Sequence, residues 1–172
     1  SELSGENHGR GVSMGFWFND GMESSASASI NADGTIHLIL GSVDIGGQRA
    51  SLAMQFAESM VIEYEAVKPQ VVDTDSVGFN GVTGGSRTTY ATGWAAYEAA
   101  LDVREQMIER AANHWETSTE QVSFEEGLFK HLGESDKQLT FKKMAAIVSE
   151  SESPVIGRAS ANLGFGVGGS WG

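Results

Sequence analysis

Alternating apolar and polar residues predict β-structure in the first forty residues. Residues 12–18 carry an apolar side chain at every second position, which is the period of a strand. Residues 22–30 alternate small and polar side chains, and a third segment places Ile36, Leu38 and Leu40 on one face. Asn-Asp-Gly and Asp-Gly turns separate these segments. We therefore expect an antiparallel meander of three strands.

Two later segments have the three- and four-residue spacing of helices. The first begins near residue 48 and repeats Leu52, Phe56 and Met60 at intervals of four. The second, residues 88–115, is the longest helical signal. Its expected apolar stripe consists of Tyr90, Trp94, Tyr97, Leu101, Ile108, Ala111 and Trp115. Both tryptophans of this stripe are expected in the core, and the alanines in the first half of the helix indicate that something packs closely there.

Shorter elements complete the pattern. Residues 67–73 predict a strand, residues 122–131 a hairpin, and residues 141–149 a short helix capped by Thr140. The last sixteen residues contain six glycines and little periodicity. The expected fold class is α+β, with a mixed, largely antiparallel sheet of about five or six strands and two long helices packed on one face. Residues 1–172 are expected to form a single domain.

Composition excludes several classes of protein. Eleven basic residues against 23 acidic ones give a formal net charge of −12, which disfavours nucleic acid as a partner. The absence of cysteine excludes disulfides and cysteine-based zinc or iron–sulfur sites within the chain. No apolar run approaches the roughly 20 residues of a membrane helix, and the N-terminus shows no secretion signal. We expect a cytoplasmic chain with no membrane partner.

Two glycine-rich loops, each followed by an arginine at a helix start, carry the strongest chemical signal. Residues 41–47 precede Arg49, and residues 78–85 precede Arg87. A helix N-terminus offers free N–H groups with partial positive charge, and arginine adds a fork that matches phosphate oxygens. The pattern therefore predicts an anion site, although neither loop is a P-loop. Surface arginines that reach nearby carboxylates are the alternative explanation.

Other chemistry has weaker support. Four scattered histidines form no pair at helical spacing, so no metal site is expected. No nucleophile elbow is present, and no catalytic residue is assigned. Asp73 and Asp75 could form an acid–base pair or bind a cation, but turn and cap roles are commoner for such residues.

Three motifs together give a more specific signal. Residues 43–51 read VDIGGQRAS, residues 72–75 read VDTD, and residues 83–93 read TGGSRTTYATG. In this order and spacing they resemble the molybdenum-binding (molybdopterin) subunit of the xanthine dehydrogenase family, which includes aldehyde oxidases and carbon monoxide dehydrogenase. The resemblance covers about residues 9–172 and is strongest over residues 33–100.

The resemblance implies that the two loops hold a molybdopterin cofactor by its phosphates, in the cytosine dinucleotide form. Carried over by position, the cofactor-binding residues are Gly46, Gly47, Gln48, Arg49, Gly85, Ser86, Arg87 and Thr88. The family's commoner first loop has its glutamine before the second glycine. Here Gly47 precedes Gln48, so the glutamine is displaced by one position.

The resemblance also implies an activity and partners. The parent protein would be an oxidoreductase, a molybdenum hydroxylase that oxidises an aldehyde or N-heterocycle C–H with water-derived oxygen. Its electrons would leave through iron–sulfur and flavin subunits or domains. The family's active-site glutamate lies downstream in a Gly-Val-Gly-Glu-type motif, and residues 166–169 have glycine in its place.

We therefore expect a fragment of the molybdopterin-binding domain that grips the cofactor and lacks the catalytic glutamate. Its partner would be the remaining part of the molybdenum subunit. Alone, it should be inactive, bind no cofactor tightly and self-associate through its exposed apolar surface. The alternative is a stand-alone, non-catalytic ligand-binding or oligomerisation module.

Overall fold

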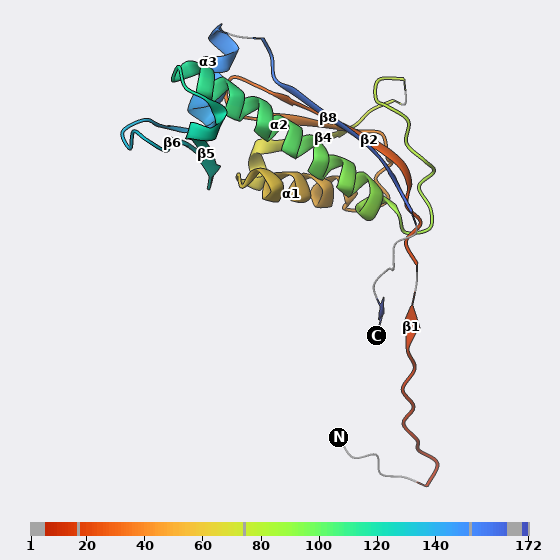
Figure 1. Cartoon of the computed structure of the whole chain (residues 1–172). Coiled ribbons are helices and arrows are strands. Elements are labelled where there is room, and N and C mark those ends of the chain that lie inside the picture. Colours follow the sequence, from red (N-terminus) through yellow and green to blue (C-terminus); the bar gives the residue numbers. More distant parts are fainter. Residues whose placement is uncertain (1–5, 17, 74, 152, 165–169, 172) are drawn as a thin grey trace.

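The main body is a four-stranded sheet with two long helices on one face (Figure 1). The computed structural model describes residues 6–16, 18–73, 75–151, 153–164 and 170–171. The strand order is β4-β3-β2-β8, with β2 Met22–Ile30, β3 Ile36–Leu40, β4 Val67–Val71 and β8 Ile156–Leu163. β2 pairs antiparallel with β3 and β8, whereas β4 pairs parallel with β3. The predicted α+β class and mixed, largely antiparallel pairing are confirmed.

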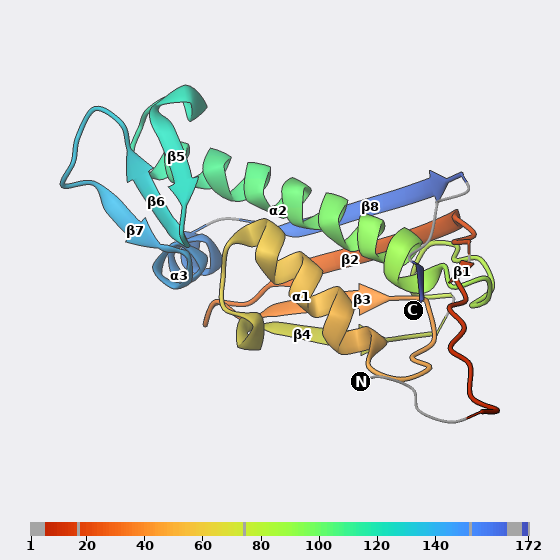
Figure 2. The same ribbon diagram turned by 90° about the horizontal axis from the view of Figure 1, so that it is seen from below.

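Two helices cover this sheet side by side (Figure 2). α1 spans Gln48–Met60, and α2 spans Gly93–His114 directly after a π-helical turn, η2, at Thr88–Thr92. Both helices begin at the same end of the sheet (Figure 2). α2 lies so close to β8 that a Cβ on Gly157 would stand 2.5 Å from the carbonyl oxygen of Ala99. Glycine at this position therefore permits the close approach.

The predicted apolar stripe of α2 is wrong in its first half, whereas Ala111 is buried and Ile108 packs partly buried against the core, as predicted. Trp94 and Tyr97 are 45% and 38% exposed, while Trp115 packs partly buried against the core. The buried face of α2 consists of Gly93, Ala95, Ala96, Ala99, Ala100, Val103, Met107, Ala111 and Ala112. A helix this close to a sheet has no room for an indole ring, so its small side chains face inward.

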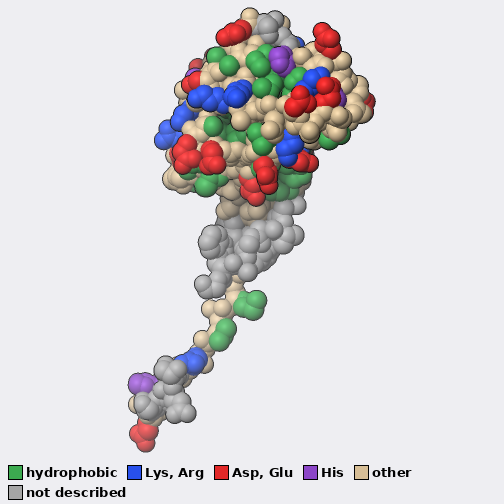
Figure 3. Space-filling model, turned by 90° about the vertical axis from the view of Figure 1, so that its left-hand side faces the viewer, with side chains coloured by type: hydrophobic (Ala, Val, Ile, Leu, Met, Phe, Trp, Pro, Cys, Tyr) green, Lys and Arg blue, Asp and Glu red, His purple; other side chains and the backbone are tan. Residues whose placement is uncertain are grey.

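A second sheet lies beyond the C-terminal end of α2. It consists of β5 Val122–Glu125, β6 Leu128–His131 and β7 Gln138–Thr140 in that order, followed by α3 Phe141–Ser151. The rings of Phe124 and Phe129 stack at 4.4 Å, and Phe141 adjoins both. The backbone N–H of Lys143 donates to Thr140 Oγ1, which confirms the predicted cap. Acidic and basic side chains are interspersed at this end of the molecule (Figure 3).

The predicted single sheet of five or six strands is therefore wrong, because the strands divide between two main sheets. The predicted first strand also does not join β2. Among the described residues of that segment, Gly15–Phe16 alone form a strand, β1, which pairs with β9, Ser170–Trp171. Val12 and Met14 are each 91% exposed on a segment that leads away from the body (Figure 1).

Two short 3-10 turns, η1 Tyr64–Ala66 and η3 Thr119–Gln121, precede β4 and β5. Residues 166–169, which were expected to have glycine in place of a catalytic glutamate, lie outside the described residues. Among the helices of the described segments, none combines the length and apolarity that crossing a bilayer requires.

Candidate functional site

The two glycine loops, about forty residues apart in sequence, meet at one cavity of about 810 Å³. They meet because α1 and α2 start at the same end of the sheet (Figure 2). Ile45 of the first loop and Gln48, the first residue of α1, reach the cavity, and Ser86 reaches it directly after the second loop. Trp94 and Tyr97, on the exposed side of α2, form another wall. Of the eight carried-over residues, Gln48 and Ser86 line the cavity directly.

The first loop binds a carboxylate of its own. Asp44 Oδ1 accepts the backbone N–H groups of Gly46 at 2.9 Å and Gln48 at 3.0 Å, and Oδ2 accepts Arg49 Nε at 2.8 Å. The Arg49 guanidinium, followed by these N–H groups, holds the pKa of Asp44 well below its usual range. The start of α1 is therefore already partnered by an anion. Arg49 is thus a surface arginine that pairs with a nearby carboxylate, which is the alternative to an anion-binding role.

Gly46 and Gly47 adopt positive φ values of 134° and 73°, which favour glycine. No atom lies within 4 Å of the position that a Cβ would occupy on either residue. Their backbone is consequently open for close approach by a ligand.

Arg87 of the second loop is fully buried and turned toward the protein. Its Nε donates to the carbonyl of Gly21 at 2.7 Å, and its Nη1 donates to that of Gly81 at 3.0 Å. Its Nη2 donates to the Glu23 carbonyl and to Ser24 Oγ. Burial lowers the pKa of Arg87, and the negative charges of Asp20 and Glu23 oppose that shift. The guanidinium thus fastens the second loop to the start of β2.

A chain of buried hydroxyls continues from this guanidinium. Thr92 Oγ1 lies 3.0 Å from Ser24 Oγ and 2.6 Å from Ser42 Oγ, within hydrogen-bond distance of both. Ser42 belongs to the first loop, so the network joins the two loops behind the cavity. Sequence reasoning missed the network of Ser24, Ser42 and Thr92, because hydroxyl residues that lie far apart in the sequence give no sign that they meet in the fold. Thr92 lies within the motif of residues 83–93, but the motif does not indicate its partners.

The start of η2 presents a different helix end from that of α1. No side chain of the described residues caps it, and its first turn holds no acidic residue. Ser86 precedes it in the left-handed conformation with φ 54°, and Gly85 has φ 61°. The first N–H groups of a helix have no partner within the helix. This end therefore offers an uncapped, partially positive terminus next to the Ser86 hydroxyl.

Three buried oxygen atoms near this site have no hydrogen-bond partner among the described residues. They are Gln48 Oε1, Gln55 Oε1 and Thr88 Oγ1. Gln48 and Gln55 line the cavity, and Gln55 Nε2 donates to the Thr89 carbonyl at 3.3 Å. Unsatisfied buried acceptors are uncommon in folded proteins, so these oxygens fit a ligand that carries N–H donors.

Asp73 has the turn role that is commoner for such residues. Its carboxylate accepts the Ser76 hydroxyl at 2.9 Å and the Asp75 N–H at 3.0 Å. The Ser76 hydroxyl is the main cause that lowers the pKa of Asp73. Across the described ranges, no group of three or more His, Asp or Glu is placed to hold a metal ion.

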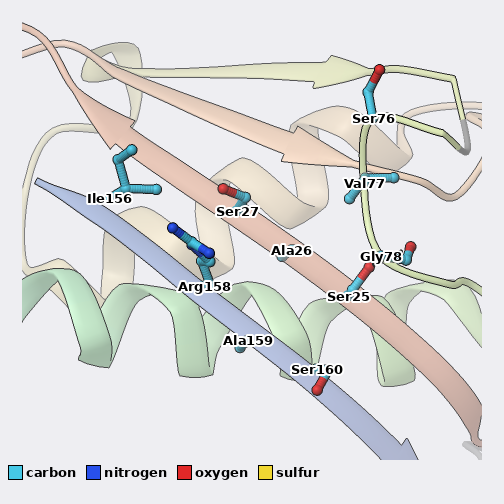
Figure 4. A pocket seen from close by; sticks show the side chains of 10 residues that line it. All are labelled: Ser25, Ala26, Ser27, Ser76, Val77, Gly78, Ile156, Arg158, Ala159 and Ser160. Carbon is cyan, nitrogen blue, oxygen red and sulfur yellow. Dashed lines mark hydrogen bonds between the residues drawn. The ribbon is translucent and has the colours of Figure 1, made fainter.

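A second hollow, of about 560 Å³, lies on the sheet face opposite the helices (Figure 4). Ser25 and Ser27 of β2 and Arg158 and Ser160 of β8 form its floor, and residues 76–78 form one wall. None of the predicted site residues lines it. The cavity between the glycine loops is therefore the candidate site.

Comparison with known proteins gives a consistent set of similarities. Residues 3–163 match a family described as the molybdopterin cofactor-binding domain. The chain is 24% identical over 148 residues to the nicotine 6-hydroxylase large subunit of Paenarthrobacter nicotinovorans, covering 86% of this chain and 18% of that protein.

Solved structures share the fold. Two structures of CO dehydrogenase, one of them the reconstituted enzyme from Oligotropha carboxidovorans, match with a TM-score of 0.79 at 21% and 20% identity. Each match covers 89% of this chain and 22% of the other. Quinoline 2-oxidoreductase from Pseudomonas putida 86 matches with a TM-score of 0.72 at 18% identity, over 87% of this chain and 22% of that chain. The chain thus spans about a fifth of the length of these relatives.

Proposed function

We propose that this chain, which belongs to the molybdopterin cofactor-binding domain family, holds the phosphates of a molybdopterin cofactor. The phosphates would lie in the cavity between its glycine loops. The observation that carries the proposal is the meeting of both loops at one cavity beside an uncapped helix terminus. Anions bind readily at such termini. The volume of about 810 Å³ is within the usual range for small-molecule sites.

The two loops would make unequal contributions. At the second loop, Gly85, Ser86 and Thr88 would hold phosphate through backbone N–H groups and the Ser86 hydroxyl. Arg87, whose donors meet protein oxygens, would position that loop. At the first loop, Asp44 already accepts the N–H groups of Gly46 and Gln48, so that loop would contribute mainly open glycine backbone and the Gln48 amide. Arg49 would hold Asp44 in place.

The cytosine dinucleotide form fits the remaining walls. Trp94 and Tyr97 expose rings whose centroids lie 5.4 Å apart, and exposed aromatic faces stack on planar bases. The unpartnered oxygens of Gln48 and Gln55 would accept N–H groups from a heterocycle. The cavity would thus bind phosphate at one end and a flat ring with N–H groups at the other, and a nucleotide combines these two parts.

When bound, molybdopterin supplies the redox chemistry of molybdenum. The lining residues would bind and orient the cofactor rather than transfer protons, since the side chains around the cavity in the described part of the chain include no carboxylate or imidazole. The catalytic base would therefore come from outside this cavity. The whole protein would be a molybdenum hydroxylase for aldehyde or N-heterocycle C–H bonds. It would work with iron–sulfur and flavin partners, and this chain would be a piece of its molybdopterin-binding domain.

The test is a pair of variants matched in size, Ser86→Glu and Ser86→Gln, in the protein at its natural length. Metal content is measured by elemental mass spectrometry, and pterin content by fluorescence after oxidation. A carboxylate about 4 Å from a phosphate should cost about 1–4 kcal/mol, so Ser86→Glu should lose most of its molybdenum. Ser86→Gln should lose less, and the exposed α3 variant Ser149→Ala should lose none.

Equal molybdenum content in the Glu and Gln variants would refute phosphate binding next to Ser86. Acid hydrolysis of the wild-type protein should release cytidine monophosphate, and release of none would refute the dinucleotide form. A natural-length protein without molybdenum or pterin would favour the stand-alone module.

A further inference from the structure

The main sheet ends at an open edge, the outer side of β8. In the described part of the chain, β8 is the last strand of its sheet and pairs only with β2. Backbone groups of a strand point alternately to its two sides. The N–H of Arg158 points away from β2, because it donates to Asp102 Oδ2 of α2 at 2.8 Å. By this period, Ser160 and Asn162 also direct their N–H and C=O groups outward.

Side chains of α2 occupy only the first half of this edge. Asp102 takes the Arg158 N–H, and Gln106 Nε2 donates to the Ile156 carbonyl at 2.9 Å. No comparable contact reaches the outward backbone groups of Ser160 or Asn162 from the described residues. In one half of the edge, side chains of α2 thus take the hydrogen bonds that a neighbouring strand would make. In the other half, the outward backbone groups have no such partner among the described residues.

A groove of about 460 Å³ runs along the open half, between β8 and α2. Figure 2 shows the two elements side by side at this border of the sheet. Trp94, Glu98 and Leu101 form the α2 wall beside Ser160 and the residues that follow it. The groove gives an added strand both free backbone partners and space for its side chains.

The charge of this groove selects the partner. Glu98, Asp102 and Glu105 follow one another on α2 at helical spacing, and none forms an ion pair with a described residue. Arg158 is the single basic residue that lines the groove in the described segments. A second copy of the chain, paired through β8 about a two-fold axis, would bring two acidic rows together at the seam. Nucleic acid would be repelled for the same reason.

We propose that the outer edge of β8 binds an extended, basic segment of a partner protein as an additional strand. Its backbone pairs with Ser160 and Asn162, and its lysines or arginines face Glu98 and Glu105. This interface on β8 is separate from the proposed phosphate site between the glycine loops, although Trp94 lines both cavities.

The test uses the protein at its natural length and a fluorescein-labelled decapeptide that alternates lysine with valine or threonine. Fluorescence anisotropy measures binding. Two control peptides separate the two contributions: one replaces lysine by glutamate, and the other keeps the lysines but is N-methylated at alternate residues, which removes strand donors. The basic peptide should bind, and both controls should bind at least about tenfold more weakly.

Two variants test the same contributions on the protein. Glu98→Gln with Glu105→Gln should weaken binding of the basic peptide severalfold, up to about tenfold, as expected from the loss of two partly exposed ion pairs between α2 and the peptide. Ser160→Pro removes an outward N–H and leaves the ladder to β2 intact, so it should weaken binding without changing the thermal midpoint. Glu150→Gln, at an exposed position of α3, is the matched control.

Equal binding of the N-methylated and unmodified peptides would overturn the proposal whatever the variants do. Protection of the Ser160 and Asn162 amides from hydrogen exchange in the protein alone would also overturn it, because the edge would then be covered by the protein's own chain. Neither result would bear on molybdenum content.

Discussion

Replacing Arg87 by methionine tests whether this residue holds the second loop to the sheet or holds a ligand. In the structure its guanidinium contacts three backbone carbonyls and one hydroxyl. Methionine retains much of the apolar volume and removes every donor. The expected result is a loss of folding stability that is present even without cofactor.

The magnitude follows from which acceptors lose their partners. The Glu23 carbonyl keeps the N–H of Gly81, and Ser24 Oγ keeps Thr92. The carbonyls of Gly21 and Gly81 lose the donors described above. A buried group left unsatisfied costs about 1–3 kcal/mol, so two such groups set a loss of about 2–6 kcal/mol. Relief of the buried charge offsets part of this, and we expect about 3 kcal/mol.

Urea unfolding of the cofactor-free protein measures this loss, with hydrogen exchange over residues 19–24 and 78–92 to locate it. In a chain of this size a loss of about 3 kcal/mol lowers the thermal midpoint by about 6–12 °C. Arg87→Lys should be intermediate, because one ammonium cannot reach all three carbonyls. Arg49→Met is the matched control, since its ion pair with Asp44 is exposed to solvent and should contribute much less to stability.

If Arg87→Met unfolds within about 0.5 kcal/mol of the wild type, as a surface substitution would, the guanidinium does not anchor the loop. A loss of molybdenum without a loss of stability would instead assign Arg87 to the ligand.

Three further predictions concern other parts of the chain. Gly157→Ala should destabilise the fold by about 1–3 kcal/mol in urea unfolding, because its Cβ would stand 2.5 Å from the Ala99 carbonyl oxygen. Ser86→Gly should raise the thermal midpoint slightly, since glycine removes a left-handed strain of about 1 kcal/mol, while molybdenum content falls with the lost hydroxyl. The pKa of Asp44 is lower in the folded chain than in the unfolded chain, so ionised Asp44 stabilises the fold above the ordinary carboxyl pKa of about 4 and this contribution is lost as pH falls. In thermal unfolding at a series of pH values, Asp44→Asn should therefore flatten the decline of stability below about pH 4, and an unchanged decline would contradict this assignment.

Local patterns in the sequence were enough to predict several elements. The predicted start of the first helix near residue 48 is confirmed, as are the hairpin of residues 122–131 and the Thr140 cap. These features depend on spacing and turn chemistry within a few residues. The two glycine loops and their order also indicated the family, because such motifs are contiguous in the chain.

Tertiary contacts decided the rest. The sequence offered α2 an aromatic face and an alanine face, and only the close approach of β8 made the alanine face the buried one. β8 itself gave no periodic apolar signal, and its pairing with β2 made it a strand. Two arginines in matching sequence positions also diverged. Arg49 is exposed beside Asp44, and Arg87 is buried among carbonyls, because their neighbours come from different distances along the chain. Sequence could place two cations at two helix starts, but which acceptors surround each guanidinium is a property of the folded chain.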